Sequence, residues 1–223
     1  MSININVNGQ SIPLSDKNVS DIFHVMYYDS KVWADTHWFG HQILKCPLDM
    51  WMYQEIFNEI KPDYVIECGT FRGGSALYYA HLFDLMGHGE IITIDIEPRE
   101  NLPVHPRIHY MTGSSSDTAL AASVEEIICQ GGTDKKVVVL LDSDHSYQHV
   151  LAEMHTWHHL VSRGSYMIVE DSNVNGFPVR PDFGPGPMEA INEFMSVNND
   201  FEIDLSREKF FMTQNPRGYL KKK

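Results

Sequence analysis

Four acidic residues stand directly after two apolar runs of the sequence. Asp142 and Asp144 follow KVVVLL, and Glu170 and Asp171 follow YMIV. If these runs are neighbouring parallel strands, carboxylates at their ends are about 4.8 Å apart and can converge on one ion. Hard oxygen donors without a cysteine favour Mg²⁺, with Mn²⁺ or Ca²⁺ as alternatives. We therefore expect a divalent metal site, because clustered carboxylates without a cation would repel one another and raise their pKa values.

One histidine stands within the first acidic group. His145 lies three residues after Asp142, on the same predicted turn. A hydroxyl held by a metal loses its proton more easily, and imidazole can accept that proton near pH 7. We predict a catalytic role for His145 with Asp142; a histidine that only orients the turn is the competing interpretation. His149, on the helix predicted to follow, is interpreted as a surface or packing residue.

A glycine-rich turn follows an earlier apolar run. ECGTFRGGS places Glu67 at a strand end, Gly69 and Thr70 in a turn, and Gly73 and Ser75 where a helix begins. The glycines allow the backbone to approach a ligand closely. A dinucleotide fingerprint would read G-x-G-x-x-G and would present helix amides to a pyrophosphate, which Glu67 would repel. A carboxylate here suits a cationic ligand, such as the amino-acid end of S-adenosylmethionine.

Polar residues also end the next two predicted strands. Asp95, 28 residues after Glu67, can accept hydrogen bonds from both ribose hydroxyls of such a cofactor. Ser114 and Ser115 follow the third strand and would border the adenine. A turn that is merely solvated is the competing interpretation for each group.

Alternating apolar runs and helical segments are needed to bring these residues together. Strands are expected at 64–68, 91–95, 108–112, 136–142 and 166–171, and helices at 47–60, 75–86, 119–129 and 148–161. This alternation predicts an α/β fold with a mainly parallel sheet and helices on both faces, with ligands beyond the carboxyl ends of the strands. We divide the chain into an N-terminal arm with a lead-in segment (1–46) and a cofactor-binding core (47–223). A Pro/Gly-rich loop near 176–188 could form a lid over the site.

Composition narrows the class of ligand. The 223 residues carry 17 Lys plus Arg against 30 Asp plus Glu, a net charge of −13 that argues against a nucleic-acid partner. No run approaches the roughly 20 apolar residues of a membrane span, and the first residues do not resemble a secretion signal, so no membrane partner and a cytoplasmic location are expected. The three cysteines are far apart and are expected to be reduced.

Several blocks, taken in order, resemble the cephalosporin hydroxylase/rhamnosyl O-methyltransferase family. They are WFGHQILKCPLDMWMYQEIF, ECGTFRGGSALYYA, ITIDIEPR, LLDSDHSYQHVLAE, GSYMIVEDSNVNG, FGPGPMEA and NPRGYLKKK. The resemblance implies a Rossmann-like class I methyltransferase with a seven-stranded sheet. It also implies Mg²⁺-assisted transfer of a methyl group from S-adenosylmethionine to a hydroxyl of a small molecule, such as a sugar or a secondary metabolite.

The resemblance assigns roles to individual residues. It puts Gly69 in the cofactor loop and the ribose on Asp95, and it makes Glu170 and Asp171 metal ligands together with one earlier acid. Comparison with the cephalosporin enzyme favours Asp144 as that acid. Comparison with catechol-type O-methyltransferases favours Asp142, and their catalytic lysine is replaced here by His145. The predicted sets are therefore His145 and Asp142 for catalysis; Glu67, Gly69, Thr70, Gly73, Ser75, Asp95, Ser114, Ser115 and Asp142 for the cofactor; and Asp144, Glu170 and Asp171 for the metal.

Other functions are weighed against this one. A non-haem iron hydroxylase would use Asp144 and two histidines, but the nearby histidines gather on one predicted helix. A binding module on the same fold, or an NAD-dependent oxidoreductase, would need no metal site. Trp38, Phe177, Phe183 and Met188 could line an acceptor pocket, and exposed aromatic residues make a homo-oligomer plausible.

Overall fold

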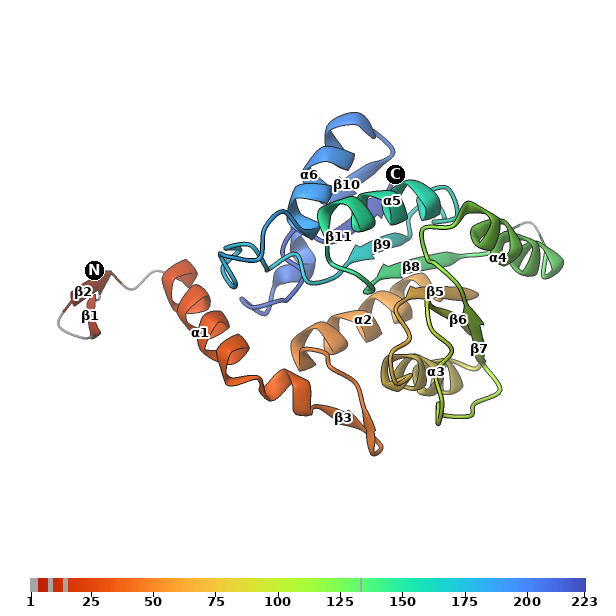
Figure 1. Ribbon diagram of the computed structural model, residues 1–223, viewed down its shortest axis with the longest axis horizontal. Helices are drawn as coiled ribbons and strands as arrows, with labels where there is room; N and C mark the ends of the chain where they lie inside the picture. Colours follow the sequence, from red (N-terminus) through yellow and green to blue (C-terminus); the bar gives the residue numbers. More distant parts are fainter. Residues whose placement is uncertain (1–3, 8–9, 14–15, 133) are drawn as a thin grey trace.

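The computed structural model describes residues 4–7, 10–13, 16–132 and 134–223 (Figure 1). A hairpin of β1 (Asn4–Val7) and β2 (Gln10–Pro13) precedes α1 (Asp16–Ser30), and Figure 1 shows both to one side of the main sheet. The start of the sequence, with its alternating apolar residues followed by Asn-Gly, predicts a short strand and then a turn. The strand is present as β1, and the turn predicted at residues 8–9 lies outside the described residues. A 3₁₀ turn, η1 (Val32–Asp35), and a short hairpin, β3 (His37–Trp38) with β4 (His41–Gln42), lead into the core.

Seven strands form the central sheet in the order β10-β11-β9-β8-β5-β6-β7. They are β5 (Tyr64–Cys68), β6 (Glu90–Asp95), β7 (Ile108–Thr112), β8 (Val137–Leu141), β9 (Tyr166–Val169), β10 (Phe201–Ile203) and β11 (Tyr219–Lys222). Strands β5 to β9 pair in parallel, and β11 runs antiparallel between β9 and β10. The predicted mainly parallel, seven-stranded sheet is confirmed.

Helices cover both faces of this sheet. They are α2 (Pro47–Ile60), α3 (Gly74–Met86), α4 (Thr118–Gln130), α5 (Tyr147–Trp157) and α6 (Pro187–Val197). Along β8, Val137, Val139 and Leu141 pack with α4, α5 and α6, whereas Val138 and Leu140 pack with α2 and α3. Because alternate side chains of a strand point to opposite faces, a strand that is apolar throughout must be covered on both sides. Figure 1 shows the resulting three layers.

The segment predicted as a lid is shorter than expected. Pro187 and Met188 already belong to the first turn of α6. Proline suits that position because its fixed φ is helical and its missing N–H would have no partner there. A 3₁₀ turn, η2 (Leu205–Glu208), lies between β10 and β11. None of the described helices is both long enough and apolar enough to span a bilayer.

The strand order reverses between β5 and β8, and the chain approaches itself closely there. A Cβ on Gly69 would lie 1.9 Å from the carbonyl oxygen of Asp142, and Gly69 has a φ of +105°. Only glycine fits this position, since it tolerates both the contact and the backbone angle. The cleft beyond the strand ends therefore opens at the switch in strand order, where ligands of open α/β sheets bind.

A buried carboxylate ties α2 to the end of the chain. Asp49 accepts hydrogen bonds from the Thr213 hydroxyl (2.5 Å), the Gln214 amide (2.8 Å) and the Tyr219 hydroxyl (3.0 Å). Burial raises the pKa of Asp49 to about 6, although these three donors oppose the shift. The network fixes the first turn of α2 and, with it, the residues that immediately precede the helix.

Asp49→Ala should destabilise the fold. Three buried donors would lose their acceptor, which is expected to lower the free energy of unfolding by about 2–3 kcal/mol. Urea unfolding followed by circular dichroism measures the change, with Asp200→Ala, at an exposed position, as the matched control. Equal stability of the two variants would mean that the network does not anchor α2.

Candidate active site

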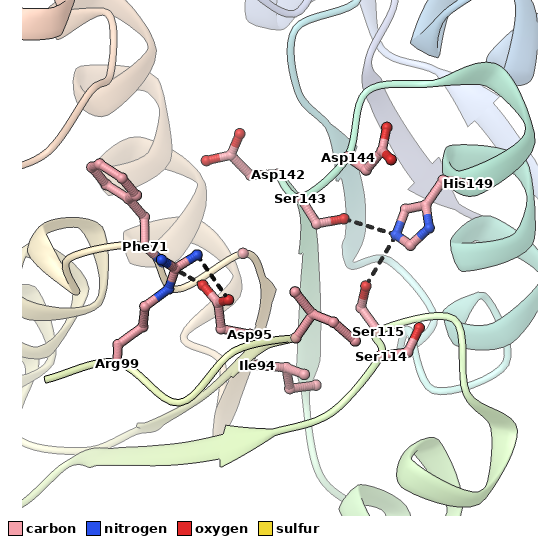
Figure 2. A pocket seen from close by; sticks show the side chains of 12 residues that line it. Phe71, Ile94, Asp95, Arg99, Ser114, Ser115, Asp142, Ser143, Asp144 and His149 are labelled. Carbon is pink, nitrogen blue, oxygen red and sulfur yellow. Dashed lines mark hydrogen bonds and ion pairs between the residues drawn. The ribbon is translucent and has the colours of Figure 1, made fainter.

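Two adjoining cavities lie at the carboxyl ends of the parallel strands. The first has a volume of about 520 Å³ and lies between β6, the turn after β7 and the start of α5 (Figure 2). The second has a volume of about 320 Å³ and lies between the glycine-rich turn, the end of α1 and the loop before α6. Gly69, Phe71, Asp142 and Ser143 border both cavities. A molecule that occupied both would pass directly by the Asp142 side chain.

Asp95 forms the floor of the first cavity. Its carboxylate accepts hydrogen bonds from the backbone amides of Phe71 (2.9 Å) and Glu97 (3.1 Å), and it pairs with Arg99 at 3.1 Å. Burial works against its charge, but Arg99 and the two amides lower the pKa of Asp95 below its ordinary value. The adjacent Ile96 side chain is 66% exposed, which is unusual for isoleucine and gives the cavity an apolar surface.

The opposite wall of the first cavity is polar. Ser115 and Ser143 both donate hydrogen bonds to one oxygen of the buried Glu153, at 2.5 and 2.6 Å. His149 lies between these serines, with Nε2 at 3.0 Å from the Ser143 hydroxyl (Figure 2), and Ser114 is nearby. His149, interpreted from the sequence as a surface or packing residue, lies in the first turn of α5 and borders the first cavity.

The glycine-rich turn contributes unequally to the cavities. Thr70 and Ser75 border the second one, as does Gly69. Gly73 borders neither; a Cβ there would lie 2.9 Å from Pro103, so its small size serves packing. Glu67 is fully buried beneath the turn, where one carboxylate oxygen accepts a hydrogen bond from Thr93 at 2.6 Å. Burial raises the pKa of Glu67 to about 7, although Lys45 opposes the shift.

Asp142, His145 and Asp171 converge beside the second cavity. Each offers one potential ligand atom, and these atoms lie within 4.8 Å of one another. His145 Nε2 is 3.0 Å from Asp171 Oδ2 and 3.8 Å from Asp142 Oδ1. Burial alone would lower the pKa of His145, but the carboxylates of Asp171, Asp142 and Glu170 raise it to about 9. Two carboxylates and an imidazole form a donor set that suits a divalent cation.

Asp144 does not join this group in the structure. Its carboxylate accepts a hydrogen bond from the Ser146 amide (2.8 Å), which holds it on the exposed rim near the start of α5. Figure 2 shows Asp144 on the same side as His149 and separate from Asp142. Of the two acids left open by the sequence, the structure brings Asp142 next to Asp171, and a metal-binding role for Asp144 stays a prediction.

Glu170 faces a residue that sequence reasoning missed. Lys45 is almost completely buried, and its Nζ lies 2.7 and 2.8 Å from the two oxygens of Glu170 and 2.5 Å from Asp142 Oδ2. Burial opposes a charge on Lys45, but the carboxylates of Asp142 and Glu170 outweigh it and hold the pKa of Lys45 well above its ordinary value. The sequence feature that could have identified Lys45 is its lone charge in the otherwise apolar stretch ILKCPL.

Aromatic side chains line the second cavity. Tyr28 and Trp33 stack at 5.4 Å between ring centroids, and Arg180 lies 5.2 Å from the centroid of the Phe183 ring. Of the predicted acceptor residues, Phe183 is therefore at this cavity. Phe177 and Met188 border a different cavity, next to His24. Trp38 instead packs edge-on against Tyr78, with ring centroids 4.9 Å apart.

Known proteins resemble this chain over most of its length. The family model described as Rhamnosyl O-methyltransferase/CmcI matches residues 30–223. A protein named Rhamnosyl O-methyltransferase from Mycobacterium bovis (strain BCG / Pasteur 1173P2) is 41% identical over 210 residues, covering 91% of this chain and 84% of the relative. One of the same name from Mycobacterium leprae (strain TN) is 38% identical over 211 residues, covering 92% and 91%.

Solved structures share the fold. CmcI with Mg and SAM matches with a TM-score of 0.63 at 20% identity, over 85% of this chain and 77% of that one. MycE methyltransferase with Mg and SAH matches with a TM-score of 0.50 at 18% identity, over 65% and 38%. The predicted class I methyltransferase architecture is thus confirmed. Together with the match of the family model over residues 30–223, these findings show that the chain belongs to the Rhamnosyl O-methyltransferase/CmcI family.

Proposed function

We propose that this protein transfers the methyl group of S-adenosylmethionine to a sugar hydroxyl, with a rhamnosyl residue as the first candidate acceptor. The observation that carries the proposal is the junction of the two cavities at Asp142, beside His145 and Asp171. A cofactor and an acceptor in separate cavities would meet there. The choice of a rhamnosyl acceptor is supported by the printed names of curated relatives of which the chain covers 84–91%.

The first cavity suits the adenosine part of the cofactor. Asp95 keeps a carboxylate ionised for the ribose hydroxyls, Ile96 gives an apolar surface for a flat base, and Ser114 and Ser115 offer polar atoms at its edge. The amino-acid end would then extend past Gly69 toward Thr70 and Ser75. The predicted cofactors agree with solved relatives, whose titles name Mg with SAM or SAH.

The carboxylates of Asp142 and Asp171 are the residues proposed to hold Mg²⁺, with Mn²⁺ or Ca²⁺ as alternatives. They fit a cation because two half-buried acids close together, with the buried Glu170 nearby, repel one another without positive charge. A divalent ion there would act as a Lewis acid that lowers the pKa of the acceptor hydroxyl. Glu170 and Asp144 stay predicted ligands.

His145 is the proposed general base. Its Nε2 points to Asp171 and Asp142, at the edge of the second cavity. The acceptor O–H bond would break with its proton passing to Nε2, the oxygen would form a bond to the methyl carbon, and the carbon–sulfur bond would break to leave S-adenosylhomocysteine. Alignment of oxygen, carbon and sulfur between the two cavities can contribute up to roughly 7–11 kcal/mol.

An iron hydroxylase would need two histidines at one metal, whereas the metal-capable group found among the described residues contains His145 alone. The homo-oligomer and the cytoplasmic location stay predictions.

Asp95→Asn should weaken cofactor binding. The amide cannot accept two charge-assisted hydrogen bonds from ribose, so the Kd for S-adenosylhomocysteine should rise by about tenfold or more. Isothermal titration calorimetry measures this, with Glu100→Gln, an exposed acid on the same loop, as the control. An unchanged Kd would remove Asp95 from the cofactor site.

His145→Ala should separate a general base from a metal ligand. We expect kcat to fall about 10²–10⁴-fold while Mg²⁺ binding persists, whereas Asp171→Asn should lose Mg²⁺ affinity. The exposed His159→Ala is the control. If His145→Ala loses as much Mg²⁺ affinity as Asp171→Asn, His145 is a ligand and not the base.

The pH dependence should follow the same histidine. An imidazole accepts a proton only when neutral, so kcat of the wild type should rise with pH and then level off. The carboxylates raise the pKa of His145 to about 9 in the metal-free protein. A bound cation opposes that shift, so the rise of kcat with pH should lie below pH 9. A profile that is unchanged in His145→Ala would contradict the assignment.

Trp33→Ala should raise KM for the acceptor and leave the Kd of the cofactor unchanged, because Trp33 lines only the second cavity. Transfer of labelled methyl from S-adenosylmethionine to p-nitrophenyl rhamnoside, compared with the glucoside, measures both activity and preference. Trp51→Ala, which truncates a 60% exposed tryptophan, is the control. If a folded protein that binds the cofactor transfers methyl to neither glycoside, these sugars are ruled out as acceptors.

A further inference from the structure

Lys45 lies at the centre of the buried acids rather than at their edge. Its side chain is 3% exposed, and its Nζ contacts Asp142 Oδ2 and both oxygens of Glu170. The other Asp142 oxygen, Oδ1, points toward His145. The Asp142 carboxylate therefore contacts the Lys45 ammonium group through one oxygen, and its other oxygen faces the group that can hold a metal.

The location of Lys45 in the fold limits its freedom. It directly precedes Cys46 and Pro47, where α2 begins, and Asp49 anchors that first turn to the C-terminal segment. On its other side, Gly74 packs so tightly against this segment that a Cβ would lie 2.1 Å from the carbonyl oxygen of Gln42. The backbone on both sides of Lys45 is thus held in place, and this fixes the position of the Lys45 ammonium group.

The charges around Lys45 explain why a cation is needed there. Asp142, Glu170 and Asp171 bring three carboxylates into one buried region, while Lys45 and His145 are the basic groups that contact them among the described residues. Burying such acids without compensation is costly. In the protein without a metal, Lys45 supplies positive charge to the Asp142 carboxylate, which a divalent ion would also attract.

We propose that Lys45 is a positioning residue that pairs with Glu170 and shares Asp142 with the catalytic divalent cation, holding these carboxylates together when the ion is absent and limiting the ion's affinity when it binds. The proposal rests on the proposed function, which places the ion at Asp142 and Asp171. It assigns Lys45 no contact with the cofactor or the acceptor. Its effect is electrostatic: a fixed ammonium next to a metal site repels a second cation.

The test is Mg²⁺ binding to Lys45→Met, measured by calorimetry, and by Mn²⁺ paramagnetic resonance as a second probe. Methionine keeps most of the length of the side chain and removes its charge. We expect affinity for Mg²⁺ to rise about tenfold or more. The metal-free variant should melt at a lower temperature than the wild type, and Mg²⁺ should raise its melting temperature by more.

Three further variants isolate the cause. Lys45→Arg keeps the charge and should bind Mg²⁺ like the wild type. Lys45→Met combined with Glu170→Gln removes both members of the ion pair and should recover stability without metal. Lys209→Met, which removes the lysine of an exposed pair with Glu55, controls for the general loss of a lysine and should bind Mg²⁺ like the wild type.

If Lys45→Met folds and binds Mg²⁺ no more tightly than the wild type, the proposal is wrong. If Lys45→Met does not fold, Mg²⁺ binding to Glu170→Gln is compared with Mg²⁺ binding to the double variant, Lys45→Met with Glu170→Gln. The proposal then requires the double variant, which lacks Lys45, to bind Mg²⁺ more tightly. These outcomes are separate from failure of the proposed function, which would appear as a wild type that turns over no acceptor or does so without a divalent ion.

Discussion

The repulsion between buried and half-buried carboxylates at the ends of β5, β8 and β9 is the constraint on which the site depends. Glu67, Asp142, Glu170 and Asp171 come from three neighbouring strands, so the sheet itself forces them together. In a low-dielectric interior each acid must be protonated, hydrogen-bonded or paired with a cation. Glu67 has a raised pKa and a hydroxyl partner, Glu170 has Lys45, and Asp171 has His145. These contacts of Glu67, Glu170 and Asp171 answer this one requirement.

That requirement explains why the segment before the sheet is part of the site. A lysine that neutralises acids at the strand ends has to reach them from outside the sheet, and Lys45 does so from the connection between β4 and α2. Asp49 fastens the same connection to the C-terminal segment, including Tyr219 of β11. The boundary predicted at residue 46 separates Lys45 from the acids it contacts, so the division marks the start of α2 and not the edge of the functional unit.

Local sequence patterns were sufficient to predict the sheet and the kinds of residues that line the cleft. VVVLL is apolar at every position, which predicts a strand covered on both faces, and the polar residues after such strands meet at one edge by topology alone. The direction of individual side chains was not predictable in this way. Asp144 turns to the Ser146 amide, Glu67 lies beneath its turn, and His149 points at the cavity, each because of a contact made in three dimensions. Lys45 was missed because its partners are 97 and 125 residues away.

Asp142 connects the functions that the sequence suggested separately. Its backbone carbonyl lies against Gly69 of the cofactor turn, its Oδ2 contacts Lys45, and its Oδ1 faces His145. It also borders both cavities. A shift of this one residue would therefore move the wall of the first cavity, the paired lysine and the metal-capable group together. Because packed interiors resist such shifts, the fold sets how the two cavities are arranged around Asp142.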